Sequence, residues 1–181
     1  IIVGAYGDDN YQVSQPGRNF MGAAYVFNKD EGGVNNWGQV AKLTASDRNN
    51  NLDHYFGKAV AINQDYAVVA APENGAGAAY IFEKDRGGAN NWGELTKIEG
   101  TYVNPNHFGH SVAISKKYVA VGAFEPNRAS GSSPGMVYLF FKYQDGVNKW
   151  GLLKKIEPDV TDSSLSDQFG SSVSFDETGR H

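Results

Sequence analysis

The stretch GAAYVF at residues 22–27 decides the fold, because it is written again as GAAYIF at residues 77–82 and as GMVYLF at residues 135–140. The copies begin 55 and 58 residues apart. Self-similarity at a nearly constant period indicates a repeat architecture. In each copy a glycine precedes an apolar run with aromatic residues at its fourth and sixth positions, which is typical of a short β-strand that follows a turn.

Three further markers recur in the same order around each copy: a glycine- and asparagine-rich turn that ends in Trp-Gly, a Phe-Gly dipeptide, and an apolar strand. The turn occurs at residues 29–38, 84–93 and 144–151, the dipeptide at 56–57, 108–109 and 169–170, and the strand at 1–5, 66–71 and 118–123. In the turn, Gly and Asn supply positive φ angles and the Trp is expected to pack on the outer strand. A Trp that stacks on a sugar is the alternative.

One full unit predicts four short strands, at residues 56–62, 66–70, 77–83 and 92–98. The second is apolar almost throughout, which suits a strand covered on both faces. No ten-residue stretch has convincing helical periodicity. We therefore predict an all-β fold, a β-propeller segment of about three four-stranded antiparallel blades. A β-sandwich is the alternative, but it would not need a fixed order of markers at a constant period.

The ends of the chain are predicted to be out of phase with the blade boundaries. Residues 1–181 are expected to form a single propeller segment, with blade parts 1–43, 56–98 and 108–156 and the first strand of a further blade at 169–175. Three sheets closing a ring alone would stand about 120° apart, too far to pack at about 10 Å. The remaining arrangements are a homodimer that exchanges terminal strands to close a six-bladed ring, and a longer chain that supplies further blades.

Phe-Gly followed about a dozen residues later by Gly-Ala or Ala-Ala-Pro resembles the FG-GAP repeat. The matches are residues 56–57 with 70–72, and residues 108–109 with 122–123. That repeat forms the blades of the integrin α-subunit propeller and of many bacterial surface or secreted proteins. The resemblance implies an extracellular or cell-surface protein that works in recognition or adhesion.

Many members of that family bind calcium in an Asp-x-Asp-x-Asp-Gly-like loop between the first two strands of a blade. Calcium needs six to eight oxygen ligands. Here the corresponding turns are Asn-Gln-Asp at residues 63–65 and Ser-Lys-Lys at 115–117, and residues 176–181 keep only two acids. We predict no cofactor and no metal site; calcium is the alternative, although its loop motif is degraded.

The composition excludes several classes of protein. The 16 Lys and Arg residues against 20 Asp and Glu give a net charge of −4, so no strongly basic surface for nucleic acid is expected. The chain has no cysteine, which excludes disulfides, thiolate metal sites and cysteine nucleophiles. No apolar run approaches the roughly 18 residues of a membrane span.

The loops of such blades fall on two faces. One face carries regular hairpins, whereas the loops and connectors of the other vary between copies. Binding groups are commonly placed on irregular loops of a rigid scaffold, so we predict a protein or glycan ligand on the variable face. The candidate ligand-binding residues are Tyr6, Asp8, Asp9, Tyr11, His54, Tyr102, His107, Phe124 and Glu125.

Catalytic signals are weak. Asp47 with Asp53, or Asp162 with Asp167, could be paired carboxylates for glycoside chemistry, but no spacing fixes their separation. The serines of residues 130–133 lack the Gly-x-Ser-x-Gly elbow of hydrolases. We therefore predict a non-catalytic recognition or adhesion scaffold. The alternatives are a polysaccharide-acting enzyme and a structural subunit that assembles through open blade edges.

Overall fold

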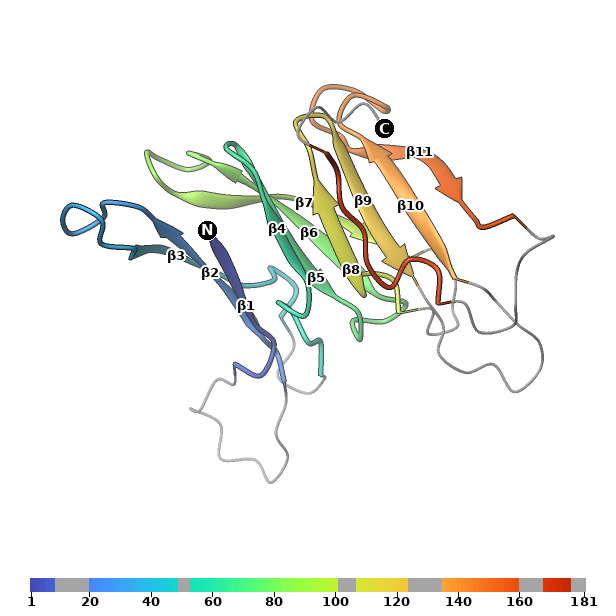
Figure 1. Cartoon of the computed structure of the whole chain (residues 1–181), viewed down its shortest axis with the longest axis horizontal. Coiled ribbons are helices and arrows are strands. Elements are labelled where there is room, and N and C mark those ends of the chain that lie inside the picture. Colours follow the sequence, from blue (N-terminus) through green and yellow to red (C-terminus); the bar gives the residue numbers. More distant parts are fainter. Residues whose placement is uncertain (9–19, 49–52, 101–106, 124–134, 160–167, 177–181) are drawn as a thin grey trace.

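The computed structural model describes residues 1–8, 20–48, 53–100, 107–123, 135–159 and 168–176. These residues form eleven strands in three antiparallel sheets and contain no helix, which confirms the all-β prediction. The sheets lie side by side in a row (Figure 1) and do not close into a barrel.

Each sheet is a meander in which strands that follow one another in sequence are neighbours. The first sheet contains β1 (Ile2–Ala5), β2 (Ala23–Asn28) and β3 (Gly38–Leu43). The second contains β4 (Val60–Ile62), β5 (Tyr66–Ala71), β6 (Ala78–Lys84) and β7 (Trp92–Glu99). The third contains β8 (Ser111–Ile114), β9 (Tyr118–Ala123), β10 (Met136–Phe141) and β11 (Gly151–Ile156).

The first strand of a unit is shorter than predicted, because the Phe-Gly dipeptide forms a turn instead of extended chain. The backbone N–H of Lys58 donates to the carbonyl oxygen of Tyr55 at 3.0 Å. The third residue of this turn, Gly57, has a φ of 91°, which only glycine adopts without strain. The same turn recurs from His107 to His110 and from Gln168 to Ser171. The Phe-Gly marker is therefore explained by turn geometry.

The glycine that opens each copy of the GAAYVF stretch lets one repeat approach the next. Gly22, Gly77 and Gly135 all have positive φ, and a Cβ atom there would lie 1.9, 2.2 and 2.0 Å from the carbonyl oxygens of Phe56, Phe108 and Phe169, respectively. Each of these phenylalanines belongs to the Phe-Gly turn of the following repeat. Isolated parallel bridges join Gly22 to Phe56 and Gly135 to Phe169. Neighbouring repeats are thus interlocked through backbone contacts.

The core lies between the sheets, and the second sheet is buried on both faces. Along β5, Ala67 and Val69 pack toward the first sheet, whereas Val68 and Ala70 pack toward the third. All four are inaccessible to solvent. This alternation confirms the prediction that the apolar strand is covered on both faces.

The phenylalanines of the first two Phe-Gly turns pack edge-on against the aromatic pair of their own repeats. The ring centroid of Phe56 lies 5.3 Å from that of Tyr80 and 6.1 Å from that of Phe82. Phe108 lies 5.1 Å from Tyr138 and 6.2 Å from Phe140. Such edge-to-face pairs add about 1 kcal/mol to the free energy gained from burial.

The glycine–asparagine turn is a self-contained loop. Asn35 and Asn90 have φ angles of 59° and 61°, and their backbone N–H groups donate to the carboxylates of Asp30 and Asp85 at 2.6 Å. The tryptophans that follow the second and third turns, Trp92 and Trp150, are buried. A buried ring cannot stack on a sugar, so the packing interpretation holds for these two tryptophans.

Residues 169–175 differ from the strand predicted there. Phe169 makes its bridge to Gly135, but residues 170–175 form turns, bends and irregular chain. A strand needs a hydrogen-bonded neighbour, and no strand among the described residues lies beside this segment. Val173 and Phe175 nevertheless pack on the third sheet. The segment therefore covers this sheet face in the way that β8 and its Phe-Gly turn cover the second sheet.

Candidate ligand-binding face

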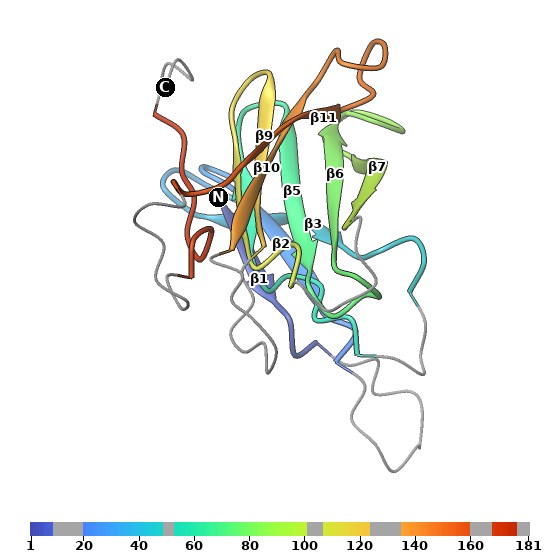
Figure 2. The same cartoon turned by 90° about the vertical axis from the view of Figure 1, so that its right-hand side faces the viewer.

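The strands β1, β3, β5 and β7 all end at the same end of the sheets. This is the lower end in Figure 1, and Figure 2 shows it from the side. The hairpin turns lie at the opposite end. The candidate site is therefore built from loops that the stacked sheets hold in place.

An aromatic group stands at the junction of the first and second sheets. The ring of Tyr55 stacks on Phe20, with centroids 5.3 Å apart, and lies 5.8 Å from Tyr6. The backbone N–H groups of His54 and Tyr55 both donate to the carbonyl oxygen of Phe20, and the N–H of Phe20 donates to the carboxylate of Asp53 at 2.7 Å. These three hydrogen bonds fix the position of Tyr55 before any ligand arrives.

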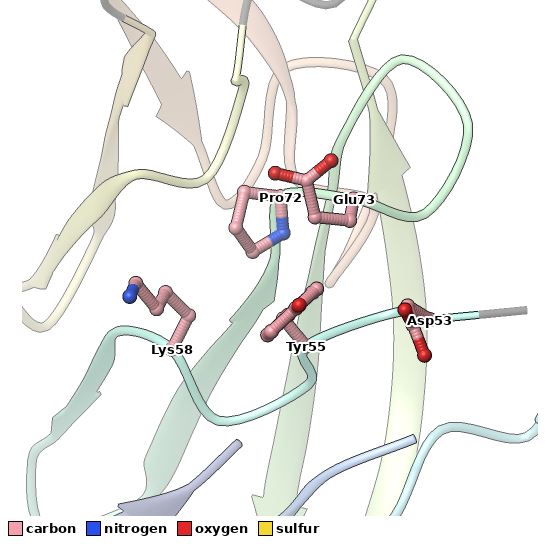
Figure 3. A pocket seen from close by; sticks show the side chains of 5 residues that line it. All are labelled: Asp53, Tyr55, Lys58, Pro72 and Glu73. Atoms are coloured by element: carbon pink, nitrogen blue, oxygen red, sulfur yellow. The ribbon is translucent and has the colours of Figure 1, made fainter. Parts of the chain in front are cut away.

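A hollow of about 560 Å³ opens beside this group, lined by Asp53, Tyr55, Lys58, Pro72 and Glu73. Figure 3 shows Tyr55 between Lys58 and Asp53, with Pro72 and Glu73 on the next loop. The hollow combines an aromatic ring, two carboxylates and an amine.

Two further groups border the hollow. The ammonium group of Lys58 lies 4.5 Å from the centroid of the Tyr6 ring, a cation–π contact. Nδ1 of His107 lies 3.3 Å from a carboxylate oxygen of Glu73. Desolvation raises the pKa of the Tyr55 hydroxyl, and the charges of Asp53 and Glu73 raise it further. This hydroxyl therefore stays protonated at neutral pH and can donate a hydrogen bond.

The predicted site residues fall into three groups. Tyr6 and His107 border the hollow. Asp8 is hydrogen-bonded to the first sheet, and His54 is buried. Asp9, Tyr11, Tyr102, Phe124 and Glu125 lie outside the described residues. Ligand contacts at all nine positions stay a prediction.

The carboxylate of Asp8 anchors its loop to the first sheet. It accepts hydrogen bonds from the hydroxyl of Tyr25 at 2.5 Å and from Nζ of Lys42 at 2.8 Å. Burial raises the pKa of Asp8, but the bonds from Lys42 and Tyr25 more than offset this effect and lower it. Asp8 is therefore an ionised structural partner of β2 and β3.

Asp47 repeats this arrangement on the second sheet. Its carboxylate accepts hydrogen bonds from Tyr80 at 2.6 Å, from Asn74 at 3.3 Å and from Lys97 at 2.7 Å. Burial raises the pKa of Asp47, but bonds from Lys97, Tyr80 and Asn74 bring it down to about 2. A carboxylate held ionised in this way cannot act as the general acid of a glycosidase.

The hollow contains residues that sequence reasoning did not select as ligand contacts, namely Asp53, Tyr55, Lys58, Pro72 and Glu73. One sequence signal could have indicated Tyr55: the residue before the constant Phe-Gly dipeptide differs between the repeats. The residue before each Phe-Gly is Tyr55, His107 or Gln168, and all three have positive φ of 51°, 45° and 52°. The backbone at this position has a repeated structural role, whereas the side chain changes from repeat to repeat.

His54 is a buried neutral imidazole beneath the site. Only 3% of it is exposed, and its Nδ1 has no hydrogen-bond partner among the described residues. Burial is the main reason that its pKa lies below 6.5; Lys97 lowers it further, and the charges of Asp47 and Asp53 oppose the shift.

A pH-dependent loss of stability is expected from this burial. Below about pH 6.5 the unfolded chain binds a proton at His54 that the folded chain resists, so the free energy of unfolding falls as the pH drops from about 7 to 5. The His54→Gln variant, which cannot bind this proton, is expected to lose less over that interval. Urea unfolding of both proteins at the two pH values measures the difference. Equal losses would show that His54 does not resist protonation in the folded state.

The described part of the chain has no helix long and apolar enough to cross a membrane. Within the same residues, no group of three or more His, Asp or Glu side chains is arranged to hold a metal ion.

Meander sheets of three or four strands, stacked face to face and interlocked by Phe-Gly turns, define a propeller-type repeat protein. Comparison with protein families is more specific: the FG-GAP repeat matches residues 37–82 and 92–140, just over half of the 181 residues. The chain therefore belongs to the FG-GAP repeat family, as its sequence markers predict. No curated protein matches it. FG-GAP repeats are commonly involved in binding and adhesion, and they occur in extracellular or surface proteins in general.

Proposed function

We propose that this chain is a non-catalytic recognition or adhesion scaffold, located outside the cell or on its surface, that binds a protein or glycan ligand at the hollow beside Tyr55. The observation that carries the proposal is an aromatic ring, pinned by backbone hydrogen bonds, with two carboxylates and an amine around it. The binding and adhesion roles common to FG-GAP repeats support the same conclusion.

The chemistry of the hollow suits hydroxyl- and amide-bearing ligands. The Tyr55 ring offers a flat apolar surface whose order is already established, so little conformational entropy is lost on binding. Asp53 and Glu73 are exposed acceptors for hydroxyl or amide hydrogens, and Lys58 is an exposed donor. The volume lies in the range of about 300–1,000 Å³ that small-ligand sites occupy. A sugar unit or the side chain of a docked protein loop would fit there.

The proposal assigns no catalytic residue. Of the carboxylates considered for glycoside chemistry, Asp47 is ionised and bound by three donors, and Asp53 accepts the N–H of Phe20. A general acid needs a raised pKa, which Asp47 lacks. The proposal also includes no cofactor. In the turn between β4 and β5, where calcium would bind, the side-chain oxygen of Asn63 already accepts the N–H groups of Asp65 and Tyr66.

Tyr55→Ala is expected to weaken ligand binding by about 30-fold, the usual effect of removing a central aromatic contact. The ligand is first found by screening the purified chain against a glycan array and a panel of extracellular-matrix and cell-surface proteins. Its dissociation constant is then measured by calorimetry for the parent and the variant, with and without EDTA. Chelation is expected to leave both constants unchanged.

Tyr143→Ala is the matched control, because Tyr143 is a solvent-exposed tyrosine that follows β10 at the opposite end of the sheets. It is expected to bind as the parent does. Equal affinity of Tyr55→Ala and the parent would remove the hollow from the binding site. Turnover of a bound glycan by the parent would contradict the non-catalytic assignment.

A further inference from the structure

The hairpin-turn end of the third sheet differs in charge from the same end of the second sheet. Lys142 follows β10, and its backbone N–H donates to the carbonyl oxygen of Lys117 at 2.9 Å. The N–H of Lys84 donates in the same way to Asp65, also at 2.9 Å. Lys117 therefore occupies the place that Asp65 has one repeat earlier, and a base replaces an acid.

Two neighbouring positions change in the same direction. The last turn of both sheets closes with the same backbone hydrogen bond, which Lys149 donates in the third sheet and Asn91 in the second. Lys116, in the turn before β9, corresponds to Gln64. The second repeat forms the same turns without these lysines, so the fold does not explain why they are present.

The three lysines that are new in the third repeat are not neutralised by pairing. Lys116, Lys117 and Lys149 are exposed, and none of them forms an ion pair with a carboxylate within the described part of the chain. By contrast, Lys42 and Lys97 lie 2.8 and 2.7 Å from a carboxylate oxygen. The charges of the new lysines are therefore available to a partner.

Backbone hydrogen bonds place the lysines in a row across three strands. Lys142 lies in the middle, because its N–H donates to Lys117 and its carbonyl oxygen accepts the N–H of Trp150, the residue after Lys149, at 3.4 Å. Neighbouring strands lie about 4.8 Å apart, so the backbone positions of the row span about 10 Å.

The second sheet holds the row in place. The side-chain amide of Asn63 donates to the carbonyl oxygen of Ser115, the residue before the first two lysines, at 2.9 Å. Nζ of Lys142 donates to the hydroxyl of Tyr66 at 2.7 Å and lies 4.5 Å from the centroid of its ring. Because the turns are already ordered, little conformational entropy is lost when a ligand binds to them.

Two acids lie near the row but form no ion pair with it. The carboxylate of Asp145 lies against the backbone of Gly151, at the start of β11. Glu83 accepts a hydrogen bond from the hydroxyl of Tyr66 at 3.1 Å and pairs with Arg86 at 3.5 Å. In the turns at residues 115–117 and 142–150, four lysines outnumber one aspartate. This end of the third sheet is thus basic, although the whole chain has a net charge of −4.

The arrangement suits an anion that is long and narrow. A row of ammonium groups complements a chain that carries sulfate or carboxylate groups along its length. A membrane or a nucleic-acid duplex is wider, and would also meet the acidic remainder of the protein. An acidic polysaccharide can contact the row alone. The choice of a polysaccharide rests on the extracellular or surface location given under the proposed function.

We propose that the lysine row, which consists of Lys116, Lys117, Lys142 and Lys149, binds an acidic polysaccharide through ion pairs with its sulfate or carboxylate groups. The row lies at the end of the sheets opposite to the hollow beside Tyr55 (Figure 1), so the two sites do not overlap. Exposed ion pairs are screened by salt, and the affinity is therefore expected to fall as the salt concentration rises.

Calorimetry with a heparin-derived octasaccharide at about 50 mM salt tests this proposal. The variant Lys116→Gln/Lys117→Asp/Lys149→Asn carries the residues that the second repeat has at these positions, so it is expected to fold. It is expected to bind about 30-fold more weakly, since each exposed ion pair contributes a factor of about three. Lys29→Glu/Lys84→Glu is the matched control, because it changes the net charge equally at the corresponding turns of the other two sheets. It is expected to bind as the parent does.

Equal affinity of the triple variant and the parent would remove the lysine row from the binding surface, and a parent that does not bind the octasaccharide would overturn the proposal. Tighter binding of a single-stranded oligonucleotide of equal charge, or of vesicles with anionic lipid, would overturn it in favour of that partner. Tyr55→Ala is expected to bind the octasaccharide normally. A loss of affinity in that variant would assign the acidic chain to the hollow instead, so the two sites are tested separately.

Discussion

Replacing Gly77 with alanine is expected to lower the free energy of unfolding by about 3 kcal/mol or more, one of the largest effects of any single substitution in this chain. The added Cβ atom would lie 2.2 Å from the carbonyl oxygen of Phe108, and backbone atoms cannot move aside as a side chain can. Gly77 also has a φ of 90°, which alanine adopts only with strain. The measurement is urea unfolding monitored by circular dichroism.

Gly75→Ala is the matched control for the steric part of this effect. Gly75 lies two residues away and has a φ of 63°, but a Cβ atom there would meet nothing within 4 Å. It is expected to lose only about 1 kcal/mol, the cost of the backbone conformation. If both variants lost the same free energy, the close approach of Gly77 to the following repeat would not exist.

Trp150→Ala is expected to lower the free energy of unfolding by about 3–5 kcal/mol, as large-to-small substitutions of buried aromatic residues do. The indole is 2% exposed and meets Tyr66 edge-on, with centroids 5.4 Å apart. Because Tyr66 belongs to the second sheet, the substitution removes packing between two repeats and leaves a cavity. Thermal and urea unfolding give the change.

Val147→Ala provides the comparison, because Val147 lies in the same turn and is almost fully exposed. It is expected to change the free energy of unfolding by less than about 0.5 kcal/mol. A small effect of Trp150→Ala would show that the indole does not lie between the second and third sheets.

The strand order and the stacking could be predicted from the sequence, because both follow from local patterns that repeat. The burial of both faces of β5 follows from the run Ala67-Val68-Val69-Ala70-Ala71, which has no polar residue to mark a solvent-exposed face. The Phe-Gly turn was not predicted. Phenylalanine is a good strand residue, and the positive φ of Gly57 becomes necessary only when the close contact with the first sheet is known.

The candidate site could be predicted only as a face of the molecule. Tyr55 lies in the hollow because Phe20, 35 residues earlier in the chain, anchors its backbone, and no local pattern records that contact. The roles of Asp8 and Asp47 were missed for a related reason. The same tyrosine–lysine pair receives its carboxylate from different chain positions in the two sheets, so the arrangement repeats in space but not in sequence.

The interlocking of consecutive repeats is most directly tested by a nuclear Overhauser experiment on the isotope-labelled chain. The structure predicts cross-peaks between the Hα protons of Gly22, Gly77 and Gly135 and the backbone protons of Phe56, Phe108 and Phe169, respectively. These pairs lie 34, 31 and 34 residues apart, so unstructured or locally folded chain cannot produce them. Three sets of cross-peaks would establish that each repeat is closed by the next. Their absence in a folded sample would contradict the stacked-sheet account.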